Sequence, residues 1–227
     1  MDNRWGSVAD WVVGAGTLIL AATAVFQETI RGWFYRPRFN ASIKTEAPDC
    51  VAVDFTKPDG TFVAHSIYLR LWVENVGNAT AVNAEVFARN LRRQRADRSW
   101  EGVTTFLPMN LKWSNIGQVY FPRIAPEMGK HCDLGHIVDP MQRHMLREDA
   151  PRLALTTQQT SLSFDVVWPS NQRGHIIGPG DYRIDLLIAA ENARPITITV
   201  SIALRGFWVA DDTKMLRDGI GVAIVQD

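Results

Sequence analysis

The residues best suited to chemistry lie in one short segment. The run from His131 to His136 reads HCDLGH, and Asp139 and His144 follow shortly after it. Imidazole, thiolate and carboxylate groups are the ligands of zinc, which needs several of them to converge as a tetrahedron. In a strand, His131 and His136 point to opposite faces because their separation is odd. No second pair of closely spaced ligands completes a set, so we expect unrelated surface histidines, no metal site and no cofactor.

Motifs of catalysis are equally sparse. The sequence contains no Gly-x-Ser-x-Gly elbow, no phosphate-cradling glycine loop and no His-Glu-x-x-His. Asp211, Asp212 and Asp218 lie close together but outside any calcium-loop pattern, so we interpret them as a polar turn after the Phe207-Trp208 pair. We therefore predict that the protein is not an enzyme and assign no catalytic residue. An active site assembled from distant residues would leave no such motif and stays open.

A dense group of arginines in residues 89–98 is opposed only by Asp97. Such a group suits anionic lipid headgroups or a nucleic-acid backbone, and it equally suits a solvated loop. Tryptophans at positions 100 and 113 favour a contact surface, because tryptophan and arginine concentrate in binding hot spots. The residues that we expect to contact a partner or lipid are Arg92, Arg93, Arg95, Arg98 and Trp100.

One segment of the chain has the composition of a membrane anchor. Between Asp10 and Glu28, seventeen residues carry no formal charge. A helix from Trp11 to Trp33 would span roughly 33 Å, enough for the hydrocarbon core of a bilayer. We predict a transmembrane helix over residues 11–30, preceded by a short extracytoplasmic segment, residues 1–10.

The flanks of this helix predict its orientation. Aromatic and basic residues follow it, where amphipathic rings and positive charges settle at the headgroup layer. The juxtamembrane anchor residues that we expect in the linker 31–38 are Trp33, Tyr35, Arg36 and Arg38. Arg31 and Lys44 add to this basic excess, so we expect a single-pass protein of the inner membrane with its large domain in the cytoplasm.

Two other interpretations of the apolar segment stay open. Ala22-Thr23-Ala24 resembles a signal-peptide cleavage site, although the preceding residues carry two aspartates and one arginine instead of net positive charge. An apolar run of this length also occurs in core helices.

Small residues follow one side of the predicted helix at steps of three or four. They form a seam that would let two helices approach closely in lipid, and they are Gly14, Thr17, Ala21 and Ala24. We expect this seam to favour a homo-oligomer. The alternative is that membrane helices are simply rich in glycine and alanine.

The rest of the chain alternates between apolar and polar residues, which predicts strands. The clearest alternation runs through residues 67–74, 82–89, 162–168, 182–188 and 196–205. The first two form a hairpin or sequential strands of a sandwich, and residues 191–195 connect the last two as a longer hairpin loop. Weaker strands are expected in residues 39–45, 51–56, 61–64, 117–122, 131–138 and 220–225, and only residues 141–149 look helical.

This pattern predicts a mainly β protein, an immunoglobulin-like β-sandwich over residues 39–227 with one N-terminal transmembrane helix. Mid-strand residues on the apolar faces should be buried. They are Leu71, Val86, Phe164, Leu186 and Val200.

Residues 69–88, LRLWVENVGNATAVNAEVFA, resemble bacterial immunoglobulin-like modules of the CARDB type. Such modules carry an alternating strand, an Asn-x-Gly turn and a strand that opens with Thr-Ala and an asparagine. Here these features are Asn75, Gly77, Thr80, Ala81 and Asn83. The resemblance implies a sandwich without catalytic activity or a defined ligand. A cytoplasmic domain would depart from that mostly extracytoplasmic family.

Composition narrows the class of partner. Lysine plus arginine equals aspartate plus glutamate, 24 each, so nothing in the net charge favours nucleic acid. Cys50 and Cys132 do not make a disulfide framework and should be reduced thiols in a cytoplasmic domain.

We therefore predict a non-enzymatic, membrane-tethered β-sandwich that serves as an interaction or scaffold module. Its expected partners are membrane lipid, copies of itself and a protein. The alternative is a membrane effector of a bacterial antiphage defence or stress system that disrupts the bilayer when triggered. A scaffold is harmless when overproduced, whereas a triggered effector depolarises cells.

Overall fold

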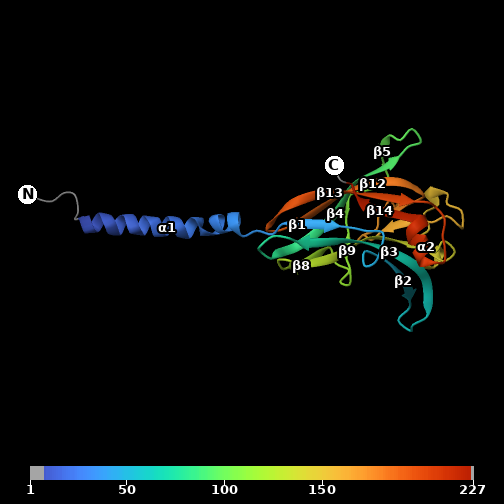
Figure 1. Ribbon diagram of the computed structural model, residues 1–227, viewed down its shortest axis with the longest axis horizontal. Helices are drawn as coiled ribbons and strands as arrows, with labels where there is room; N and C mark the ends of the chain where they lie inside the picture. The colour runs from blue at the N-terminus through green and yellow to red at the C-terminus, as the bar shows by residue number, and fades with distance from the viewer. Residues whose placement is uncertain (1–7, 226–227) are drawn as a thin grey trace, which may run out of the picture. The chain divides into compact units, whose positions relative to one another are not determined.

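A computed structural model describes residues 8–225, with the side chains of residues 28–34 left aside. The chain forms two compact units that meet between Arg36 and Pro37. The first unit contains the helix α1 (Val8–Phe34), and the second contains the β-rich domain (Figure 1).

Helix α1 is long and apolar enough over Val8–Gln27 to cross a membrane, and none of that stretch is buried. The hydroxyls of Thr17 and Thr23 donate to the carbonyls of Val13 and Ile19 at 2.9 and 2.8 Å. These two hydroxyls thus bond within the helix, as an apolar solvent would require. Full exposure argues against a core helix. A signal sequence near the N-terminus has the same length and composition.

Two antiparallel sheets pack together in the second unit, as the alternating sequence predicts. In sheet A the strand order is β1–β3–β9–β10–β11, with β2 also paired to β3 and β7 to β9. Sheet A comprises β1 (Phe39–Ser42), β2 (Cys50–Thr56), β3 (Phe62–Asn75), β7 (Lys112–Trp113), β9 (Gly129–Val138), β10 (Leu162–Phe164) and β11 (Ile176–Ile177).

In sheet B the order is β14–β13–β12–β4–β5, with β6 and β8 also paired to β4. Sheet B comprises β4 (Ala81–Gln94), β5 (Trp100–Gly102), β6 (Met109–Asn110), β8 (Tyr120–Ile124), β12 (Gly180–Ala190), β13 (Ala193–Leu204) and β14 (Ile220–Ile224).

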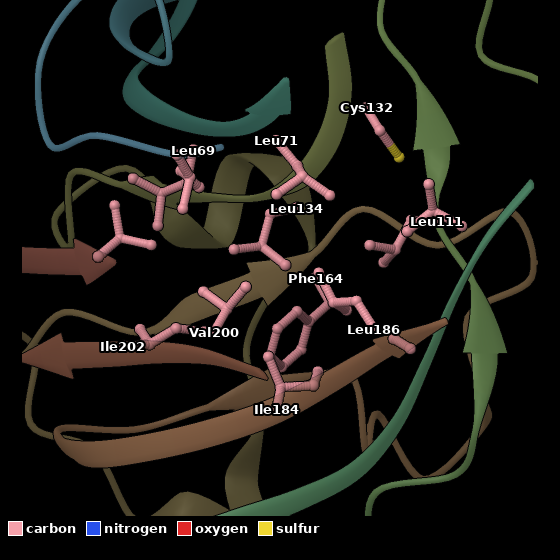
Figure 2. Close-up of a cluster of buried hydrophobic side chains, with 14 of the residues drawn as sticks. Leu69, Leu71, Leu111, Cys132, Leu134, Phe164, Ile184, Leu186, Val200 and Ile202 are labelled. Atoms are coloured by element: carbon pink, nitrogen blue, oxygen red, sulfur yellow. The ribbon is translucent and has the colours of Figure 1, made fainter. Parts of the chain in front are cut away.

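The core lies between the inner faces of the two sheets. Alternate residues of β3 and β12 are fully buried, because a strand turns every second side chain to the same face. Figure 2 shows side chains from both sheets meeting in this core, with the ring of Phe164 among them. The five residues expected to be buried are at most 1% exposed, which confirms the predicted strand registers; they are Leu71, Val86, Phe164, Leu186 and Val200.

Two connections decide between the predicted alternatives. Strands β3 and β4 belong to different sheets, so they are sequential strands of a sandwich and not a hairpin. Strands β12 and β13 do form a hairpin, but the expected loop of residues 191–195 is wrong. Ala190 pairs with Ala193, which leaves only Glu191 and Asn192 in the turn. A bulge between Ile188 and Ala190 lets the ladder continue past Pro195.

Two other predicted elements differ from the structure, and two short segments were not predicted. The expected helix 141–149 is wrong: only a short 3₁₀ segment, η1 (Arg143–Leu146), forms there, and a second one, η2 (Pro151–Leu153), follows it. The expected strand 162–168 ends at Phe164, and Trp168 is 86% exposed. A short helix, α2 (Asp212–Lys214), and a π-helical turn, η3 (Met215–Gly219), precede β14. These segments are too short for a hydrophobic period to reveal them.

Candidate functional site

A bulge in β9 gathers the histidine-rich segment on the outer face of sheet A. Leu69 of β3 pairs with Gly135, but Arg70 pairs with Asp133, so Leu134 is an extra residue. The extra residue reverses the alternation of side chains along β9. His131 lies opposite Trp72 and His136 opposite Tyr68, all on one face. The prediction that the two histidines point to opposite faces is therefore wrong.

His136 is held between two carboxylates that come from different segments. Its Nδ1 lies 3.0 Å from an oxygen of Asp165, just after β10, and its Nε2 lies 2.8 Å from Glu148, between η1 and η2. The ring stacks on Tyr68, with centroids 5.1 Å apart, and meets Phe55 edge-on at 5.6 Å.

This environment makes His136 a buried cation. Burial alone would lower its pKa, but the hydrogen bonds and charges of Asp165 and Glu148 together outweigh burial and raise the pKa to about 10. Both ring nitrogens then donate hydrogen bonds, so the imidazole has no lone pair for a general base. The group can orient and bind, but it cannot accept a proton near neutral pH.

A cavity of about 280 Å³ opens beside this group. Among its lining residues is His175, whose Nδ1 is buried without a hydrogen-bond partner in the described part of the chain. Burial lowers the pKa of His175, so this second ring is neutral near pH 7. Lys112 and Ser163 also line the cavity. The wall therefore combines aromatic surface, opposite charges and a neutral imidazole.

A second cavity of about 280 Å³ lies farther along the same strands. Trp72 and His131 line it, with ring centroids 4.8 Å apart, and His131 Nε2 lies 3.0 Å from a carboxylate oxygen of Asp49. A Cβ on Gly129 would lie only 2.2 Å from two carbons of the Trp72 indole. The glycine therefore leaves the room in which this ring packs on the sheet.

We refer to the aromatic side chains on the outer face of sheet A as the aromatic row: Phe55, Tyr68, Trp72, His131 and His136. It runs across β2, β3 and β9 between the two cavities. Sequence reasoning singled out the two histidines but not the row, because the bulge that aligns them depends on pairing with β3.

The third histidine–carboxylate group lies at the end of the sandwich. His65 of β3 contacts Asp54 at 2.5 Å and Asp212 at 2.8 Å, so it joins β2 to α2. Burial lowers the pKa of His65, but the two carboxylates outweigh burial and raise it. Asp211 caps α2 by accepting from Lys214 N, and Asp218 pairs with Arg217. The three aspartates thus have separate structural partners, which fits the predicted polar turn.

In the described residues 8–225, no group of three or more His, Cys, Asp and Glu is arranged to hold a metal ion. Cys50 and Cys132 are buried free thiols. Burial raises the pKa of Cys50 to about 12 and that of Cys132 well above its ordinary value, so both stay protonated.

The predicted arginine surface lies on β4, β5 and their connecting turn, and most of it is paired within the protein. Arg92 contacts Asp185 of β12 at 2.5 Å, and Arg95 contacts Glu101 at 2.5 Å. Arg93 donates to the carbonyl of Pro179 at 2.9 Å. The expectation that only Asp97 opposes these arginines is wrong, because Asp185 and Glu101 pair with them. Asp185 lies on β12, far from the arginines in the sequence.

Two predicted contact residues complete this edge. Arg98 has a positive φ of 67° in the turn and is exposed. The guanidinium carbon of Arg183 lies over the ring of Trp100, 4.5 Å from the centroid of that ring. The structure therefore brings the five predicted residues to one edge of sheet B, and a role in partner or lipid contact stays a prediction.

The predicted anchor residues lie on α1 and at the start of the domain. Gly14, Thr17, Ala21 and Ala24 are exposed, and open space surrounds Gly14. Tyr35 is exposed, Arg36 is half-buried, and Arg38 is exposed with its N–H 3.2 Å from Asn75 Oδ1. The side chain of Trp33 lies outside the described residues.

No protein-family model and no curated protein matches this chain. The resemblance of residues 69–88 to CARDB-type modules therefore rests on those residues alone.

Proposed function

We propose that this protein is a non-enzymatic, membrane-tethered β-sandwich module that binds a protein partner. The observation that carries the proposal is the aromatic row on the outer face of sheet A, with a cavity at each end. Tyr68 and Trp72 offer large half-buried rings, and Arg70, whose guanidinium donates to the carbonyl of Pro48, lies between them on the same strand. Tyrosine, tryptophan and arginine are the residues that dominate protein-binding hot spots.

The outer face of sheet A is a better contact surface than the arginine edge of sheet B. On that edge, Arg92 and Arg95 are engaged with Asp185 and Glu101, and a partner would have to replace those contacts. Around His136, an aromatic wall lines an open cavity together with a cation and the two carboxylates that pair with it. This mixture suits a protein surface better than a nucleic-acid backbone, which would require an excess of positive charge.

The proposed location is the inner membrane, with α1 as a retained anchor and the domain in the cytoplasm. The basis is the length and exposure of α1 together with the basic residues that follow it. An anchor confines the module to the membrane surface, where a partner in the same membrane meets it at a raised effective concentration.

Site-specific photocrosslinking of the full chain tests this function. A photoreactive amino acid replaces Tyr68 in one variant and the exposed Arg194 of β13 in another, and both are irradiated in living cells. We expect one discrete adduct with another protein from position 68 only. Trp72→Ala, introduced beside the probe, should weaken that adduct. Equal adducts at both positions, or none at position 68, would overturn the proposal.

A further inference from the structure

Strand β2 leaves one edge of sheet A unpaired. It pairs only with β3 in the described part of the chain, from Cys50 opposite Leu69 onward. Arg70 N donates to Asp49 O at 2.8 Å, which fixes which residues of β2 bond to β3. Hydrogen-bonded positions alternate along an antiparallel pair. Val51, Val53 and Phe55 therefore bond to β3, whereas the backbone groups of Ala52 and Asp54 point away from the sheet.

This edge is open to a partner. Ala52, Val53 and Asp54 are all exposed, and the β2–β3 hairpin extends beyond the rest of the sandwich (Figure 1). Proteins commonly guard such edges with charged residues, proline or bulges. The one charged side chain of β2 is Asp54, and it contacts His65 Nδ1 at 2.5 Å on the side facing α2. The imidazole partly offsets its charge, and the register shift of β2 lies at the end of the strand, between Phe55 and Thr56.

We propose that β2 pairs antiparallel with β2 of a second copy of this chain, about a two-fold axis at Val53. Ala52 of each copy then lies opposite Asp54 of the other. The N–H and C=O groups of both residues pair across the axis, which makes four hydrogen bonds. An interface of this kind is self-complementary, as two-fold symmetry requires.

The two neighbouring registers are worse. Placing Asp54 opposite Asp54 sets like charges against each other, which destabilises cross-strand pairs. Placing Ala52 opposite Ala52 matches Asp54 with Cys50, whose N–H already donates to the carbonyl of Glu46 at 2.9 Å. Only the register centred on Val53 uses every outward group of Ala52 and Asp54 without either conflict.

The side chains on the outer face match in the same register. Val53 meets Val53 of the second copy, and Val51 meets Phe55 of the second copy. Pairs between aromatic and β-branched residues across a strand are favourable. The paired strands would bury less surface than a standard protein interface, so a shared membrane that concentrates the chains would support the dimer. This last step rests on the proposed anchor, but not on the proposed partner.

Disulfide crosslinking of the full chain in membranes tests the register. Val53→Cys places two thiols at a non-hydrogen-bonded pair, where Cα atoms lie about 4.5 Å apart, within the range of a disulfide. We expect mild oxidation to give a covalent dimer. Val51→Cys alone should give none, because its copies would stand about 13 Å apart at ~3.3 Å per residue. Val51→Cys and Phe55→Cys expressed together should crosslink to each other.

Two controls separate strand pairing from collision. The wild-type chain should give no dimer, because Cys50 and Cys132 are buried. Asp54→Pro removes an outward N–H and should abolish the Val53→Cys crosslink while circular dichroism confirms that the domain is folded. Crosslinks of equal yield at positions 51 and 53, or none at position 53, would overturn the proposed pairing. The Tyr68 photocrosslink reports on the partner separately, so either proposal can fail without the other.

Discussion

His136 keeps a positive charge inside the protein because Asp165 and Glu148 flank it. The two acids come from segments on either side of η2, so the imidazolium joins the loop after η1 to the sheet. Burying one charge without its partners is costly, whereas three groups in mutual contact compensate one another. The same contact orients the ring against Tyr68. One residue thus shapes both the cavity and the aromatic row.

This charge predicts a pH-dependent stability. The folded pKa of His136, about 10, lies above the ordinary value of 6.5. Its stabilising contribution is therefore complete below pH 6.5 and is lost as the pH rises through 10. Removing the ring by His136→Gln leaves two carboxylates unpaired and should cost about 3–5 kcal/mol at pH 7. Urea unfolding at pH 7, 8.5 and 10 should show a smaller difference between wild type and variant at high pH.

The matched control is His144→Gln, because His144 is exposed on η1. It should change the free energy of unfolding by less than ~0.5 kcal/mol, as surface substitutions usually do. If the free energies of unfolding of wild type and His136→Gln differ by the same amount at pH 7, 8.5 and 10, His136 is not a buried cation.

At the scale of elements, glycines mark where two segments touch. A Cβ on Gly174 would lie 1.9 Å from the carbonyl oxygen of Thr105, which is backbone and cannot rotate away. This contact holds the loop before β11 against the segment after β5. The loop in turn carries His175 into the cavity wall.

The substitution Gly174→Ala should therefore destabilise the domain by about 1–3 kcal/mol or more, the usual cost of overpacking. Gly102→Ala is the matched control, because nothing lies within 4 Å of a Cβ at Gly102. Thermal unfolding of the two variants measures the difference. Equal melting temperatures would mean that the two segments separate at little cost.

Periodic strands could be predicted from the sequence, because burial of alternate residues is a local property. The core residue Leu71 and the strands around it follow directly from that pattern. The bulge at Leu134 could not be predicted, since it exists only relative to β3. For the same reason, the sequence revealed neither the acids beside His136 nor Asp185 beside Arg92. Partners distant in sequence leave no spacing to recognise.

Helix α1 supports a prediction about association in the membrane. Replacing Gly14 and Ala21 by isoleucine keeps the helix apolar but adds bulk to the small-residue seam. Open space around Gly14 means that the added side chain does not strain the single chain. Close backbone approach drives helix packing in lipid, so the double variant should lose association in a membrane two-hybrid assay.

The control for this seam is Leu18→Ile, which keeps the apolar character and leaves the small residues unchanged. Both variants carry Asp54→Pro, so that pairing of β2 does not add to the signal. If Gly14→Ile/Ala21→Ile associates as strongly as the control, the seam only reflects the usual composition of membrane helices.

At the scale of the whole molecule, charge is balanced overall but not along the chain. The 24 basic and 24 acidic residues cancel, so long-range attraction cannot explain an affinity for membranes. Local asymmetry remains around α1, where Arg31, Arg36 and Arg38 follow the apolar stretch. Only Arg4 precedes it, beside Asp2 and Asp10. Orientation in a membrane depends on such lysines and arginines near the helix ends.

Reporter fusions test the orientation and the retained anchor together. A fluorescent protein after Asp227 should be bright and alkaline phosphatase at the same position inactive, because the basic flank keeps the domain in the cytoplasm. Changing Arg31, Arg36 and Arg38 to asparagine should weaken this bias and raise phosphatase activity. Mass spectrometry should find the N-terminal segment intact. An active phosphatase in the unchanged chain would reverse the orientation, and a mature N-terminus at Val25 would make α1 a cleaved signal sequence instead of an anchor.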